Sequence, residues 1–166
     1  MEEKRNDKLR AQIQSLRSGN RSAILSTLKE FRVQGHISIL PDLFDLLLEQ
    51  ESEEIITEIT SLLNDLKDQD GAELLSKAIA NPEYRKVQTH LVAACWQNGL
   101  AYGKHIDTFT EVVITGEYSA AIEAFTVIEE AIGDLEPIQR GHMVKRLKAR
   151  LKEVDDEKKP LLIELV

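Results

Sequence analysis

The sequence predicts an all-α protein: an α-α superhelix of about four stacked antiparallel helix pairs, preceded by one N-terminal helix. An apolar phrase recurs after 31 residues, and self-similarity at a fixed period of this length is typical of repeat architectures. Its first two copies are Ile24, Leu28 and Phe31, and Ile55, Ile59 and Leu62. No segment alternates polar and apolar residues for long enough to form a sheet. The 8 glycines among 166 residues are few for a β protein.

The segment 1–19 is predicted to be a capping helix, because Leu9, Ile13 and Leu16 recur at helical spacing. A first repeat follows at 20–50. Asn20 is a helix-capping residue type, and Pro41 suits the first turn of a second helix, where its missing N–H would be unpaired anyway.

The second and third repeats are predicted at 51–81 and 82–116. Ser52 precedes two glutamates, a pattern typical of a helix start, since the hydroxyl can accept free amides and the acids favour the positive helix end. Asn81 and Pro82 form another cap and first turn.

The fourth repeat is predicted at 117–154. A shift of 97 places Ile122, Phe125 and Ile128 on the buried positions of the first repeat. Pro160 separates its last helix from a short apolar stretch, Leu161 to Val166, and the C-terminal tail 155–166 is expected to dock as a cap or to fray.

Length and composition indicate one domain over 1–166 with a real core, since a chain of this size buries roughly 70% of its unfolded surface. The apolar runs are too short for a membrane span. Met1 is followed by charged residues and no export signal, so a cytoplasmic location is expected. One cysteine excludes an internal disulfide.

Charge is distributed unevenly along the chain. The net charge of −8 argues against a general nucleic-acid binder. Residues 1–36 carry eight Lys or Arg against four Asp or Glu, residues 42–81 carry two against eleven, and residues 138–152 carry six against none. The chain is thus basic, then acidic, then basic along its length, and this charge pattern affects which charged partners it could bind.

The repeat resembles the HEAT-repeat family, an armadillo-type class of α-solenoids. The likeness rests on a first helix, Ile24-Leu25-Ser26-Thr27-Leu28-Lys29-Glu30-Phe31, and a second, Leu40-Pro41-Asp42-Leu43-Phe44-Asp45-Leu46-Leu47. Later second helices lack the proline, and Cys95-Trp96 stands where a small or aliphatic residue is usual. The resemblance implies a solenoid whose second helices line a concave face that holds the partner.

No residue pattern indicates catalysis, a metal or a cofactor. No two of His36, His90, His105 and His142 lie at ligand spacing. Cys95 sits within an apolar helical run, where a thiol usually behaves as a small hydrophobe instead of a nucleophile. The glycines form no phosphate-binding loop.

A row of carboxylates is the candidate partner-binding surface. Asp42, Asp45 and Glu49 share one side of a helix, and later second helices carry acids in comparable positions. The predicted partner-binding residues are Asp42, Asp45, Glu49, Glu73, Asp107 and Glu111. Aligned across repeats, they would attract a basic peptide or helix. The competing interpretation is that they only keep the surface soluble.

Two other features stay open. Trp96 is either an exposed contact or a seal between repeats. The basic segment 140–152 is either a solvated flank or a site for a membrane surface, nucleic acid or another protein.

The leading functional hypothesis is a non-catalytic scaffold for protein-protein interaction. The first alternative is an enzyme, since the resemblance extends to HEAT-like proteins that repair alkylated bases or are associated with bilin attachment. The second is a self-associating structural subunit, a homo-oligomer joined through complementary charges.

Overall fold

The structure is a computed structural model that describes residues 1–166, and it is all-α, as the sequence predicted. Its helices are α1 (Glu2–Leu16), α2 (Arg21–Gln34), α3 (Leu40–Glu49), α4 (Glu53–Asn64), α5 (Asp70–Ala80), α6 (Gln88–Asn98), α7 (Ile106–Thr115), α8 (Tyr118–Ala131), α9 (Pro137–Arg150) and α10 (Lys159–Leu165). Short 3₁₀ turns precede α3, α6, α7 and α9: η1 (Ile37–Ile39), η2 (Pro82–Val87), η3 (Gly103–His105) and η4 (Ile132–Asp134). No helix is both long and apolar enough to pass through a bilayer.

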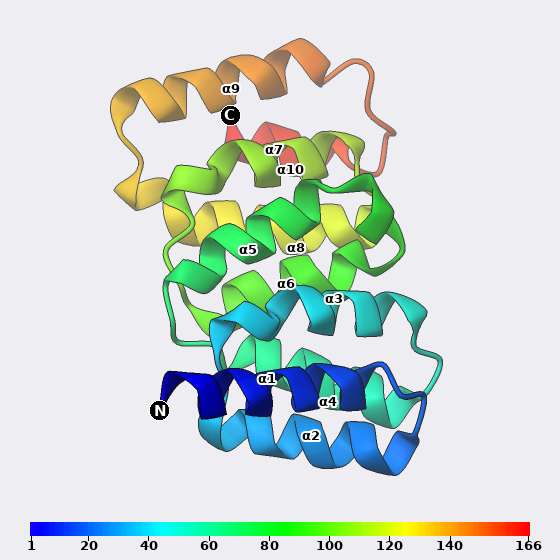
Figure 1. The fold of residues 1–166 in the computed structure, drawn as a ribbon. Coiled ribbons are helices and arrows are strands. Elements are labelled where there is room, and N and C mark those ends of the chain that lie inside the picture. Colours follow the sequence, from blue (N-terminus) through cyan, green and yellow to red (C-terminus); the bar gives the residue numbers. More distant parts are fainter.

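The helices stack in two rows. The odd-numbered helices contact one another in the order α1, α3, α5, α7, α9, and the even-numbered helices do so from α2 to α10. Figure 1 shows the odd-numbered row rising from α1 at the bottom to α9 at the top. Consecutive helices pack as α1 with α2, α3 with α4, α5 with α6, α7 with α8, and α9 with α10. The result is a solenoid-like slab in which each helix pair contacts its neighbours.

The repeated apolar phrase supplies the core between the rows. Leu28, Ile59 and Leu91 occupy equivalent places in α2, α4 and α6, and each has a relative exposure of 0%. One stripe of each helix is therefore buried against both the paired helix and the next helix in its row. The buried residues form a single cluster that runs from Leu16 to Leu165.

The fourth repeat differs from the predicted register. The buried stripe of α8 is Ala120, Ala121, Ala124, Val127 and Ile128. Ile122 is 37% exposed, so its predicted place in the core is wrong, and Phe125 is only partly buried. Small alanines allow α6 and α7 to approach α8 closely, and Ile122 turns outward.

The C-terminal segment docks instead of fraying. The last long helix ends at Arg150, before the predicted 154, and α10 buries Leu162 against the even-numbered row. Lys158 is 4% exposed, and its Nζ donates to the carbonyl oxygens of Ile114 (2.6 Å) and Gly116 (2.9 Å). This contact satisfies carbonyl groups at the end of α7.

Gly141 offers a test of the helix boundaries. It lies within α9 without a positive φ, and an added Cβ would meet nothing within 4 Å. Gly141→Ala is expected to raise the free energy of unfolding by about 0.5 to 1 kcal/mol, because alanine loses less backbone entropy. Gly99 has a φ of 66° at the end of α6, so Gly99→Ala should lower the free energy of unfolding by about 1 kcal/mol. Urea denaturation of both variants measures the two signs.

Candidate functional site

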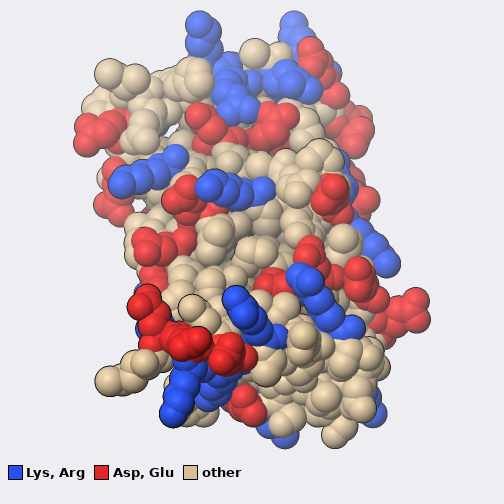
Figure 2. Space-filling model, in the orientation of Figure 1, with Lys and Arg blue, Asp and Glu red and all other residues tan.

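The six predicted partner-binding carboxylates all lie on the odd-numbered row, on α3, α5 and α7. We call the exposed surface of this row the front face. Figure 2 shows acidic and basic side chains interspersed on it, with basic residues gathered at the top over α9 and acidic residues directly below. Neighbouring helices thus carry opposite charges at this end of the molecule.

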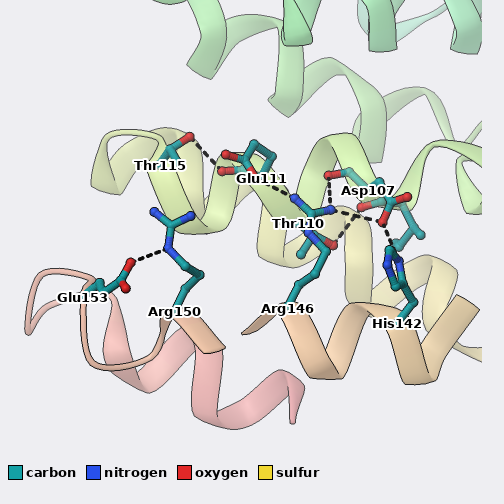
Figure 3. A network of polar contacts seen from close by, with 9 residues as sticks. Asp107, Thr110, Glu111, Thr115, His142, Arg146, Arg150 and Glu153 are labelled. Carbon is teal, nitrogen blue, oxygen red and sulfur yellow. Dashed lines mark hydrogen bonds and ion pairs between the residues drawn. The ribbon is translucent and has the colours of Figure 1, made fainter. Parts of the chain in front are cut away.

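The acids of α7 are bound by an arginine of α9. Arg146 donates to Asp107 Oδ1 at 3.1 Å and to Glu111 Oε2 at 2.5 Å, and it also reaches the Asp107 carbonyl oxygen. Figure 3 shows Arg146 between these two carboxylates, with His142 beside Asp107. Arg146 therefore joins two helices of the row and neutralises much of the charge that α7 contributes.

Two further predicted residues are also paired. Asp42 of α3 accepts a hydrogen bond from Arg17, which follows α1, at 2.7 Å. Glu73 of α5 pairs with Lys77 one turn later, and the hydrogen bond and charge of Lys77 lower the Glu73 pKa. Four of the predicted residues, Asp42, Glu73, Asp107 and Glu111, are thus engaged within the chain.

Asp45 and Glu49 keep their negative charge free of any ion pair within the chain. Both side chains are exposed on α3. Asp45 accepts a hydrogen bond from the Tyr84 hydroxyl of η2. The Tyr84 ring packs edge-on against the Phe44 ring, with 6.1 Å between the ring centroids. Burial, the hydrogen bond to Asp45 and the charges of Asp45, Glu83 and Asp42 raise the pKa of Tyr84 from 10.0 to about 12. The Tyr84 hydroxyl therefore lies in a region of negative potential.

The Tyr84 pKa provides a direct test of this geometry. Asp45→Asn should lower it toward 10.0, though incompletely, because burial is the largest cause of the shift. The folded protein holds this proton more tightly than the unfolded chain, so the associated stability is present below pH 10.0 and is lost as pH rises toward about 12. NMR titration of ¹³C-labelled tyrosine, with Tyr84→Phe assigning the resonance, measures the shift. An unchanged pKa in Asp45→Asn would contradict the contact.

Ion pairs one repeat apart also join the even-numbered row. Arg21 and Arg32 of α2 bind Glu54 of α4 and Asp65 after it, each 33 residues further along the chain. Sequence reasoning missed this ladder, although an arginine and an acid separated by one repeat length are a signal that could have found it. Such exposed pairs add little stability individually and align neighbouring repeats.

The polar residues at the end of α6 are structural. Asn98 is 4% exposed, donates to the Leu63 carbonyl oxygen of α4, and accepts from the Leu100 amide and the Tyr102 hydroxyl. Burial raises the pKa of the neighbouring Cys95 thiol to about 12. A thiol this difficult to ionise is a poor nucleophile, which favours the packing interpretation of Cys95.

The remaining candidate residues form no metal-binding cluster. Nowhere in the chain do three His, Cys, Asp or Glu side chains come together to hold a metal ion. Trp96 is 39% exposed, and its indole Nε1 donates to Glu123 at 2.5 Å. The predicted basic segment 140–152 forms most of α9 and the turn after it; Lys145 and Lys148 of α9 and Lys152 in the turn are exposed.

Comparison with family models, curated proteins and solved structures gives no match. The resemblance to HEAT repeats therefore remains an inference from the two helix phrases.

Proposed function

We propose that this protein is a non-catalytic interaction scaffold of the HEAT-repeat type that binds a basic peptide or helix of a partner protein on its front face. The observation that carries the proposal is the free negative charge of Asp45 and Glu49. Both are exposed, neither is in an ion pair, and Glu83 adds a further exposed acid nearby.

Because the other four carboxylates already have partners within the chain, the proposed contact covers a smaller part of the front face. A partner cation at Asp107 or Glu111 would have to displace Arg146, whereas one at Glu49 would displace nothing. Binding is therefore proposed to centre on the C-terminal half of α3, with Asp42, Glu73, Asp107 and Glu111 shaping the surrounding charge. A basic segment would approach this region by electrostatic steering.

The test uses a synthetic amphipathic helical peptide rich in lysine and arginine, followed by fluorescence anisotropy. The double variant Asp45→Asn/Glu49→Gln should weaken binding roughly threefold to tenfold, because each lost charge contact contributes a few tenths to about 1 kcal/mol. The matched control is Glu2→Gln/Glu3→Gln, which removes the same charge from exposed positions on α1.

Equal binding by the two double variants would show that only net charge matters and would overturn the proposed site on α3. Binding should also weaken as salt rises, because the contact is exposed to solvent. The failure of any cationic peptide to bind the wild-type protein would overturn the function itself.

A further inference from the structure

A stripe of exposed apolar side chains lies on the even-numbered row, on the helices α6 and α8. Trp96, Tyr118 and Ile122 are 39%, 40% and 37% exposed. Tyr118 and Ile122 are four residues apart on α8, so they share one face of that helix. Trp96 lies beside α8, because its indole Nε1 donates a hydrogen bond to Glu123 of that helix. We call these three residues the apolar stripe.

The core does not account for this stripe. The buried positions of α8 are taken by alanines, Val127 and Ile128, so Tyr118 and Ile122 are large apolar residues left over after packing. On α6 the fully buried Leu91 and Val92 serve the core, and Trp96 lies at its edge. Tryptophan and tyrosine in such half-exposed positions are the side chains most enriched among the residues that dominate protein interfaces.

The even-numbered helices that carry the stripe, together with α4 next to them, bear charge of a single sign. The helices α4, α6 and α8 contain six glutamates and no lysine or arginine. Arg21 and Arg32 of α2 reach two of these acids, Glu54 and Glu58. The other four, Glu53, Glu123, Glu129 and Glu130, form no ion pair. A partner that covers the stripe therefore meets uncompensated negative charge, most of it on α8.

A cleft continues the stripe at the C-terminal ends of α6 and α8. Its volume is about 590 Å³, and Trp96 forms part of its wall. Glu130 and Asp134 line it, with Lys104 and His105 on the side of η3. The cleft is large enough to receive a long side chain that extends past Trp96.

We propose that the apolar stripe and this cleft bind one cationic amphipathic helix of a partner protein. The apolar side of that helix covers Trp96, Ile122 and Tyr118, and its lysine or arginine side chains meet the glutamates of α8. A cation over the Trp96 ring adds to the contact. This surface is separate from Asp45 and Glu49 on the front face, so binding at one site can be distinguished from binding at the other.

The single tryptophan of the chain makes the test direct. Titration uses a tryptophan-free amphipathic helical peptide that carries leucines on one side and lysines and arginines on the other. Trp96 emission should shift to the blue and become protected from acrylamide. A peptide of equal charge with its leucines replaced by serine should bind at least roughly fivefold more weakly, as expected when an interface anchor is lost.

Variants then locate the contact. Tyr118→Ser/Ile122→Ser should weaken leucine-peptide binding roughly fivefold or more, and Glu129→Gln should weaken it by a smaller factor. The control, Val33→Ser, changes an 81% exposed residue of α2 and should leave binding unchanged. Circular dichroism melting verifies that the variants remain folded, and Glu129→Gln provides a readout that leaves the apolar side chains intact.

The outcomes separate this proposal from the front-face proposal. Peptide binding that depends on Asp45 and Glu49, with no change in Trp96 emission, would uphold the front-face proposal and overturn the present one. A blue shift that Asp45→Asn/Glu49→Gln does not affect would uphold the present proposal alone. No blue shift at peptide saturation, or equal affinity for the two peptides, would also overturn it.

Discussion

Leu91→Ala is expected to lower the free energy of unfolding by about 3 to 4 kcal/mol, the largest effect of any single truncation proposed here. Leu91 is 0% exposed, and its helix α6 packs against α4, α5 and α8. The truncation removes apolar contacts with several helices and leaves a cavity. The surrounding helices are themselves tightly packed and cannot move in to fill it. Urea denaturation followed by circular dichroism measures the change.

The matched control for Leu91→Ala is Leu74→Ala on α5, where the side chain is only partly buried. It should cost roughly 1 kcal/mol, because less apolar surface leaves water on folding. If the two variants lose similar amounts of stability, α6 does not occupy the centre of the stack.

Asn98→Leu is expected to lower the free energy of unfolding by about 2 to 4 kcal/mol despite the apolar character of leucine. The substitution removes the acceptor of the Leu100 amide and the Tyr102 hydroxyl, both hydrogen-bonded at 3.0 Å. It also removes the donor to the Leu63 carbonyl oxygen. Since Tyr102 is 3% exposed, its hydroxyl has no water to replace the lost partner.

A double-mutant cycle isolates this effect. Tyr102→Phe alone should cost about 1 kcal/mol, and in the Asn98→Leu background it should cost less, because the hydroxyl is already without an acceptor. Additive losses in the double variant would show that the Asn98 to Tyr102 hydrogen bond contributes nothing.

Local signals predicted the helix starts with mixed success. Asn20 accepts from the Ala23 amide and Asn81 from the Glu83 amide, as their residue type indicated. Ser52 stands at the N-cap of α4, but its side chain makes no capping hydrogen bond, so that prediction was wrong in detail. Asn81 and Pro82 were expected to start a helix, but the residues from Pro82 to Val87 form the 3₁₀ turn η2, and the α-helix begins at Gln88. Whether a residue caps a helix depends on the few residues around it. The sequence alone therefore places these helix starts to within a few residues.

The candidate site was less predictable than the helices that carry it. Spacing within α3 places Asp42 and Asp45 toward one side, and that follows from helix geometry alone. Their partners come from other elements: Arg17 follows α1, and Tyr84 lies in η2. Whether a carboxylate of α3 has a partner depends on its distance from groups on other elements. The spacing of residues along the sequence does not give that distance.

By itself the sequence determined that the protein is all-α and that an apolar phrase repeats, because both depend on side-chain spacing within one helix. Only the tertiary structure decided which residues of that pattern are buried. In α8 the close approach of its neighbours favours Ala120 and Ala124 in the core and leaves Ile122 at the surface. It likewise decided that Glu111 is neutralised by Arg146 while Glu49 is not, because the charge a partner meets depends on contacts between repeats.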